Sequence, residues 1–218
     1  MSSYVAPLKD MRFVLNELAG LAEIAKLPGY EDASADTVDA ILEEAGKFST
    51  GVLDPLNRPG DTEGAVLKDG AVTMPKGFKE AYRQFVEGGW SALPLEPEWG
   101  GQGLPKLVST PVTEMVTSAN MSFSLCPMLT QGAIEALLTA GSDALKQQFL
   151  PKMTEGSWTG TMNLTEPQAG SDLALVRTKA ERNGDHYLIT LIALEFARFS
   201  ASRFRIVGHF FLLRNPPT

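Results

Sequence analysis

The most informative stretch of this chain for fold and function is the central run, Thr161-Met-Asn-Leu-Thr-Glu-Pro-Gln-Ala-Gly-Ser-Asp-Leu-Ala174. It places a hydroxyl, a carboxylate and a rigid proline at residues 165 to 167, and a Gly-Ser-Asp triplet at residues 170 to 172. These residue types favour a strand that leads into a turn. Such a turn can present successive backbone N–H groups, which bind phosphate or pyrophosphate.

Two interpretations of this turn stay open on the residues alone. In the first, Gly170 and the Ser171 hydroxyl form a small anion nest, and the Thr165 hydroxyl bonds a flat heterocycle on the same ligand. In the second, the run is an ordinary loop in which the carboxylates of Glu166 and Asp172 accept hydrogen bonds from nearby backbone donors.

On its N-terminal side, the run follows a long series of expected helices. Apolar residues recur three and four positions apart, with N-caps expected at Asp10, at Ser34 or Asp36, and at Ser142. Pro111 is expected in or near the first turn of its helix. A Gly- and Pro-rich stretch, residues 51–76, is expected to be a loop with short extended pieces. The expected helices cover residues 11–21, 38–48, 78–90, 107–119, 131–140 and 142–153.

On its C-terminal side, the pattern changes to strands. Residues from Ser157 favour β structure, and Asn183-Gly184 predicts a hairpin turn. Residues 191–218 differ again, with four arginines, one acidic residue and five of the chain's eleven phenylalanines. We therefore expect an α+β chain with three parts: a helical domain at 1–156, a partial β domain at 157–190 and a divergent tail at 191–218.

The composition excludes several classes of protein. A net charge of −7 disfavours binding to nucleic acid. No stretch approaches the roughly 18 uninterrupted apolar residues of a membrane helix, and the first residues lack the apolar core of a secretion signal. The single cysteine, Cys126, has apolar neighbours and is expected to be a buried structural thiol rather than a nucleophile. We expect a soluble cytoplasmic protein.

Three other motifs carry no chemistry. The segment Gly100-Gly-Gln-Gly103 lacks the last glycine of the dinucleotide fingerprint, so a structural turn is expected there. The two histidines, His186 and His209, have no second ligand at metal-binding spacing. A hydrolase triad is unsupported because Ser171 has no nearby histidine. No residue of this chain is assigned as catalytic or as a metal ligand.

The central run resembles the middle-domain loop of the acyl-CoA dehydrogenases, which reads Leu/Val-Thr/Ser-Glu-x-x-Ala-Gly-Ser/Thr-Asp. Residues 164–166 and 169–172 match this pattern, while Asn163 and Leu175 depart from it. Residues 94–105 are similar to the family's Pro-x-x-Tyr/Trp-Gly-Gly-Gln-Gly segment, and residues 141–156 to its helix pair before the middle domain. The opening residues, 4–15, are similar to one branch of the family.

The resemblance implies a helical N-terminal domain, a β-barrel middle domain and a helical C-terminal domain, with FAD between the last two. It places Met162, Leu164 and Thr165 at the flavin ring and Gly170 and Ser171 at the pyrophosphate, with Glu166 in a structural role. A glutamate of the C-terminal domain would take the α-proton of an acyl-CoA while the β-hydride passes to the flavin. Electrons would leave through an electron-transfer flavoprotein, and the enzyme would be a homo-oligomer.

After Thr190 the family's Gly-x-Lys-x-Phe/Trp-Ile pattern is absent. We expect a truncated or frameshifted reading frame, with an insertion as the alternative. A short helix is one option for residues 191–200. The expected function is that of an FAD-dependent acyl-CoA dehydrogenase, present as an N-terminal fragment that is inactive alone. Two alternatives remain: a non-catalytic helical interaction module, and one chain of an enzyme split between two chains.

Overall fold

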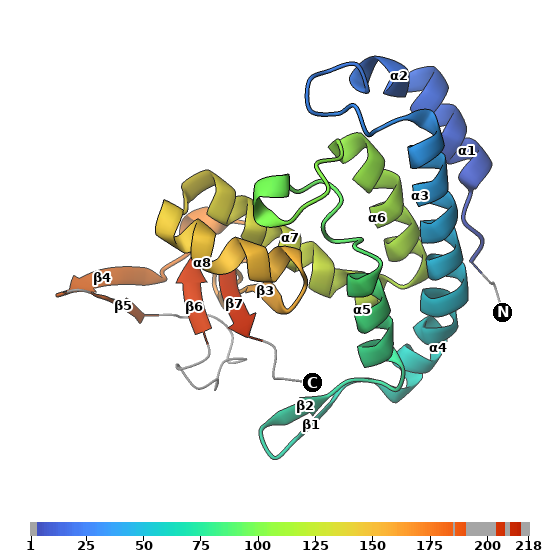
Figure 1. Ribbon diagram of the computed structural model, residues 1–218. Helices are drawn as coiled ribbons and strands as arrows, with labels where there is room; N and C mark the ends of the chain where they lie inside the picture. The colour runs from blue at the N-terminus through green and yellow to red at the C-terminus, as the bar shows by residue number, and fades with distance from the viewer. Residues whose placement is uncertain (1–3, 185, 191–203, 208–209, 215–218) are drawn as a thin grey trace.

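The computed structural model describes residues 4–184, 186–190, 204–207 and 210–214, and this part is mostly helical with a few strands (Figure 1). Two π-helical segments, η1 and η2, continue α1 and α3, and two short 3-10 segments are η3 and η4. The elements are α1 (Leu8–Phe13), η1 (Val14–Leu18), α2 (Leu21–Ile24), α3 (Ala35–Phe48), η2 (Ser49–Leu53), α4 (Asp54–Glu63), β1 (Val66–Lys68), β2 (Ala71–Thr73), α5 (Phe78–Glu87), η3 (Pro97–Trp99), α6 (Lys106–Ala119), α7 (Met121–Ala140), α8 (Asp143–Thr154), β3 (Trp158–Met162), η4 (Leu173–Leu175), β4 (Lys179–Asn183), β5 (His186–Thr190), β6 (Phe204–Val207) and β7 (Phe210–Arg214).

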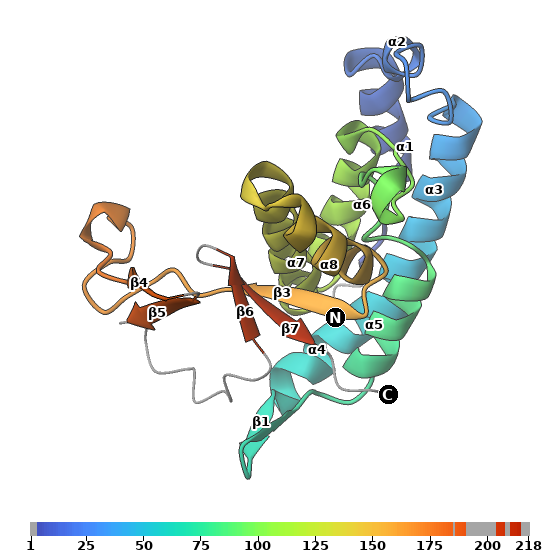
Figure 2. The same ribbon diagram turned by 60° about the vertical axis from the view of Figure 1, so that its left-hand side comes forward.

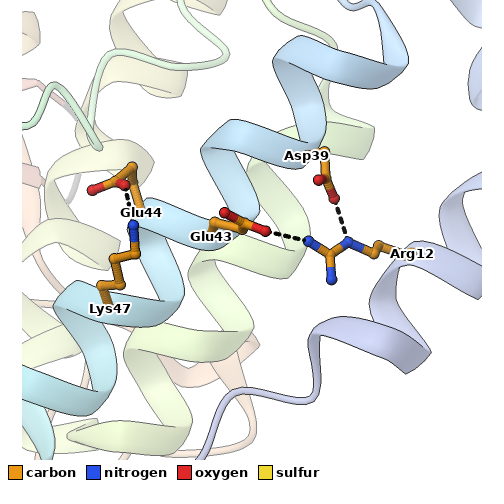
Figure 3. Close-up of polar contacts among 5 residues, drawn as sticks. All are labelled: Arg12, Asp39, Glu43, Glu44 and Lys47. Atoms are coloured by element: carbon orange, nitrogen blue, oxygen red, sulfur yellow. Dashed lines mark hydrogen bonds and ion pairs between the residues drawn. The ribbon is translucent and has the colours of Figure 1, made fainter.

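Helix α3 forms one side of the helical body and begins where the sequence predicts. The Ser34 hydroxyl accepts a hydrogen bond from the Thr37 N–H at 3.2 Å and thereby satisfies a free donor of the first turn. Across its solvent side, Arg12 of α1 bonds Asp39 and Glu43 of α3 (Figure 3). These side chains are well exposed, so the ion pairs orient α1 on α3 but add little stability.

Three apolar clusters make up the core. One lies between α1, α3 and α6, and a second joins α7 and α8 to β3 through Phe149 and Trp158, whose rings are 5.6 Å apart. The third joins α5 to α6 and α7 and is rich in aromatic rings, with Phe85 and Phe123 edge to face at 5.7 Å. Burying these faces against one another is what stabilises the helices, because isolated helices of this length are marginal in water.

One predicted helix start is corrected by the structure. Asp10 lies inside the first turn of α1 and does not cap it, since Pro7 occupies the N-cap position. Pro111 lies in the second turn of α6, near the first turn as predicted, because that helix begins directly after Pro105. Ser142 caps α8 as predicted, with its hydroxyl accepting from the Leu145 N–H.

Two helical stretches were missed by the sequence prediction. Residues 54–63 form α4 and not a loop, since Pro55 lies in the first turn, where a proline is tolerated. Gly60 fits there because a Cβ at this position would lie 2.6 Å from the Phe78 ring. Helix α7 begins at Met121, ten residues earlier than predicted, and includes Pro127.

The described strands form three small antiparallel sheets. Strands β1 and β2 make a hairpin that projects from the helical body in both views (Figures 1 and 2). Strands β4 and β5 make the predicted hairpin, in which Gly184 has a φ of +65°. In the third sheet β7 lies between β3 and β6.

Several sequence predictions concern the ends of the chain. The helix considered at 191–200 and His209 lie outside the described residues. Within the tail, the described backbone of β7 pairs along the whole of β3, from Trp158 opposite Arg214 to Met162 opposite Phe210. The three domain boundaries and the β-barrel character of the middle domain stay predictions.

Candidate cofactor-binding turn

Strand β3, which leads into the run at residues 161–174, packs against helix α7. A Cβ on Gly160 would lie 2.5 Å from the Cβ of Ala133, so only glycine permits this approach. The Gly160 N–H donates to the Thr130 hydroxyl at 3.2 Å, and that hydroxyl donates in turn to the Cys126 carbonyl at 2.9 Å. Helix and strand are therefore joined by a buried hydrogen bond one strand residue before the run begins.

The five predicted site residues lie along one continuous stretch that leaves this strand. Met162 ends β3 with 40% of its surface exposed, and Leu164 is half-buried. The chain then exposes Thr165, and after a tight turn it exposes Gly170 and Ser171. Their order along the stretch and their accessibility suit a surface-bound ligand, while their contact with flavin stays a prediction.

Residues 166–169 close the turn with a pair of backbone hydrogen bonds. The Glu166 N–H donates to the Ala169 carbonyl and the Ala169 N–H to the Glu166 carbonyl, both at 3.0 Å. Ala169 is fully buried under this bridge. The bridge places the following residues, 170–172, at the outer end of the turn.

The backbone donors at the outer end of the turn are open. Within the described part of the chain, the N–H groups of Gly170, Ser171 and Asp172 donate to no acceptor. A Cβ added to Gly170 would meet no atom within 4 Å, and the φ of this residue lies outside the left-handed region. The fold itself therefore does not require glycine at position 170, whereas a ligand that approaches the backbone closely would.

Glu166 is the most extensively bonded side chain of the turn. It is 2% exposed, and one carboxylate oxygen accepts from the Thr178 hydroxyl at 2.6 Å and the Thr178 N–H at 2.8 Å. The other oxygen accepts from the Arg177 N–H at 2.9 Å and from the Gln168 side-chain amide. These donors, the Thr178 hydroxyl first, lower the pKa of Glu166 to about 2.

The loop interpretation is confirmed for its carboxylates, whereas the anion nest stays a prediction. Glu166 and Asp172 do accept hydrogen bonds from backbone donors, the latter from the Ala174 N–H at 3.0 Å. Glu166 is structural, as the resemblance implies. The open N–H groups of residues 170–172 are what the anion-nest interpretation requires. The part played by Thr178 was missed, because no sequence signal connects two residues twelve positions apart in an irregular segment.

The other glycine-rich segment is a structural turn, as predicted. All five N–H groups of residues 100–104 donate to backbone carbonyls, for example from Gly101 to Glu96 and from Gly103 to Leu95. The Gln102 side chain adds a bond to the Gly89 carbonyl at 3.1 Å. No donor of this segment is left for a phosphate.

The prediction for Cys126 is wrong in one respect. This cysteine is exposed, although its sulfur lies near Tyr82 of α5. Neighbouring atoms still desolvate the sulfur enough to raise the pKa of its thiol, which keeps the thiolate scarce at neutral pH. No group of three potential metal-binding side chains occurs among the described residues. None of the helices described is both long and apolar enough to cross a bilayer.

Comparison with known proteins identifies the family. The model of the acyl-CoA dehydrogenase N-terminal domain matches residues 36–157, and the chain belongs to this family. A similar curated protein is 3-methylmercaptopropionyl-CoA dehydrogenase of Ruegeria pomeroyi, which is 47% identical over 217 residues. That dehydrogenase belongs to the branch of the family that residues 4–15 of this chain resemble. The alignment covers 98% of this chain, so it extends into the last 28 residues, and 37% of that protein.

Solved structures share the fold. The glutaryl-CoA complex of glutaryl-coenzyme A dehydrogenase matches with a TM-score of 0.60 at 25% identity, over 70% of this chain and 37% of that one. The structure of PigA with FAD and proline matches with a TM-score of 0.57 at 21% identity, over 71% and 38%. The chain thus spans a little over a third of the length of these relatives.

Proposed function

We propose that this chain forms the N-terminal part of an acyl-CoA dehydrogenase and contributes one side of its FAD site. The open N–H groups of residues 170–172 carry the proposal, because together with the Ser171 hydroxyl they offer the donors that a pyrophosphate accepts. Family membership and the FAD named in the PigA structure support this ligand.

The residues of the chain have separate parts in this proposal. Gly170 and Ser171 hold the pyrophosphate, and the exposed Thr165 hydroxyl bonds the edge of the flavin ring. Met162 and Leu164 offer apolar surface to the flavin ring. When bound, FAD supplies a hydride acceptor for the α,β-dehydrogenation of an acyl-CoA thioester. Electron-transfer flavoprotein as acceptor and a homo-oligomeric assembly complete the proposal by family resemblance.

We propose that the chain is inactive by itself. A general base needs a carboxylate that is free to reach the substrate proton. Glu166, the carboxylate buried in the turn, already accepts four hydrogen bonds and has a pKa near 2. Its oxygens have no free lone pair for an α-proton, so Glu166 does not serve as the base in this proposal.

A flavin titration of the whole chain tests the cofactor proposal. FAD should bind saturably, and its fluorescence should change on binding. The variant Ser171→Ala removes one hydroxyl donor to the pyrophosphate and should weaken binding about tenfold. Ser109→Ala is the matched control, because Ser109 lies in α6 and its hydroxyl bonds only the Lys106 carbonyl. A folded protein that does not bind FAD would contradict the proposal.

A turnover assay tests the inactivity. The chain, saturated with FAD, is mixed with 3-methylmercaptopropionyl-CoA or butyryl-CoA and an artificial electron acceptor. We expect no reduction of the acceptor above the rate with FAD alone. Turnover would show that a base is present within these residues.

One observation favours the alternative of an interaction module. Met121, Leu125 and Met128 follow one another at helical spacing on α7 and are 64%, 43% and 51% exposed. A stripe of this kind is typical of a surface that another protein covers. Size-exclusion chromatography with light scattering tests it, and a monodisperse monomer at high concentration would count against it.

A further inference from the structure

The carboxylate of Glu166 joins the two ends of the candidate cofactor-binding turn. The residue lies at the start of the turn, and three of its four hydrogen-bond donors lie eleven or twelve positions later, in Arg177 and Thr178. The fourth donor, the Gln168 side-chain amide, also donates to the Leu175 carbonyl at 3.2 Å. Residues 166–178 therefore form a closed loop around one buried carboxylate.

The carboxylate is saturated. An ionised carboxylate accepts about four hydrogen bonds, two on each oxygen. Oε1 accepts both bonds from Thr178, and Oε2 accepts those from Gln168 and Arg177. Two of the four donors are backbone N–H groups, which remain in place whatever side chain occupies positions 177 and 178. Within the loop, Glu166 is thus the one group whose replacement breaks all four bonds.

The closed loop contains the open donors. Residues 170–172 lie between the backbone bridge at Glu166 and Ala169 and the segment that Glu166 holds at 177–178. Their own N–H groups make no bond within the described part of the chain. Asp172 is held locally, since its carboxylate accepts from the Ala174 N–H and its carbonyl from the Leu175 N–H, whereas the placement of Gly170 and Ser171 depends on the two ends of the loop.

We propose that Glu166 is the positioning residue of the cofactor site: through Gln168, Arg177 and Thr178 it holds the loop closed and pre-orients the N–H groups of residues 170–172 for a pyrophosphate. This inference rests on the proposed function. Its benefit for binding is that the loop loses little conformational entropy when the ligand arrives, because the fold has already ordered it.

The variant Glu166→Gln tests the inference. It keeps the shape of the side chain but presents an NH₂ group to donors that need an acceptor. We expect amide hydrogen exchange in residues 164–180, measured without flavin, to rise at least tenfold. FAD affinity should fall about tenfold, while riboflavin, which has no phosphate, should lose much less. Thr178→Val removes only the hydroxyl and should have a smaller effect in the same direction.

The control is Glu181→Gln, the same replacement on the exposed strand β4, where no change is expected in exchange, FAD affinity or thermal unfolding. Unchanged exchange in both Glu166→Gln and Thr178→Val would overturn the inference. Equal losses for FAD and riboflavin would also overturn it, since they would indicate a general loss of structure. A wild type that binds no FAD would overturn the proposed function instead, and the exchange data would still decide whether Glu166 closes the loop.

Discussion

The two glycine-containing turns of this protein, residues 100–104 and residues 166–172, use their backbone donors in opposite ways. In the first, every N–H bonds a backbone carbonyl of residues 92–97. In the second, the N–H groups of residues 170–172 are open in the described structure. The first contains three glycines and the second only one. The state of the backbone donors, and not the number of glycines, therefore separates a structural turn from a candidate binding turn.

The glycines themselves differ in the same sense. A Cβ on Gly101 would lie 1.9 Å from the Leu95 carbonyl oxygen, whereas a Cβ on Gly170 would meet nothing. One glycine is required by the packing of the chain against itself. The other leaves open space beside the backbone, which the proposed pyrophosphate would occupy.

The largest effect is expected from replacing Gly101. Gly101→Ala forces a methyl group into the Leu95 backbone and should lower the free energy of unfolding by about 3 kcal/mol or more. Gly170→Ala should change it by no more than about 0.5 kcal/mol, as for an open surface position. Urea denaturation measures both changes in unfolding free energy. A similar loss in the two variants would contradict the distinction between a glycine required by packing and one in open space.

The next effect concerns the ligand. Gly170→Ala should weaken FAD binding about tenfold or more without unfolding the protein, since the added methyl group occupies the space through which a phosphate reaches the N–H groups. Equilibrium titration with FAD measures it. Gly51→Ala is the control, because that position is also open and its φ lies outside the left-handed region. Gly64→Ala would not serve, since the φ of +67° at Gly64 would strain an alanine. Full affinity in Gly170→Ala would argue that the pyrophosphate does not lie there.

A smaller effect is expected from the two glutamines of the turns. Gln102→Ala removes the bond to the Gly89 carbonyl and should cost about 0.5 to 1 kcal/mol in global stability. Gln168→Ala should leave global stability nearly unchanged and instead raise hydrogen exchange locally in residues 166–178. Thermal unfolding measures the global stability of both variants, and hydrogen exchange followed by mass spectrometry measures the local change. A global loss from Gln168→Ala would show that the second turn is part of the cooperative core.

The smallest effect is expected from lowering the pH, which should reduce the stability that the Glu166 carboxylate contributes. The pKa of Glu166 is lowered from about 4.5 to about 2 in the folded chain, so in that interval the unfolded chain binds more protons. The stabilising contribution of the carboxylate is complete above pH 4.5 and is lost as the pH falls toward 2. The difference in unfolding free energy between wild type and Glu166→Gln should narrow over this range. A difference independent of pH would contradict the assigned pKa.

Local chemistry predicted several features of the fold correctly. Ser34 and Ser142 cap helices because a hydroxyl beside an amphipathic stretch satisfies a free N–H of the first turn. The hairpin forms at the predicted place because Gly184 adopts the left-handed φ of +65° that the turn needs, while Asn183 ends β4 opposite His186. Such signals act over three or four residues, so they are readable without the rest of the chain.

Features that depend on distant contacts were not predictable in this way. Residues 54–63 contain two prolines and a glycine, yet they form a helix, because Gly60 packs under the ring of Phe78 and the helix continues from η2. Cys126 has apolar neighbours in sequence but is exposed, since burial depends on which face of α7 is covered. Neither outcome follows from the residue types nearby.

The candidate site divides along the same line. The sequence by itself determined which residues form the turn, from Met162 to Ser171, and through its resemblance which family the chain belongs to, because a short pattern of residue types is preserved in the chain order. Only the tertiary structure decided that the Glu166 carboxylate accepts hydrogen bonds from Gln168, Arg177 and Thr178. It also decided that the N–H groups of residues 170–172 have no acceptor among the described residues. The physical reason is that each backbone group must find its partner in three dimensions, and a sequence does not state which partners have been found.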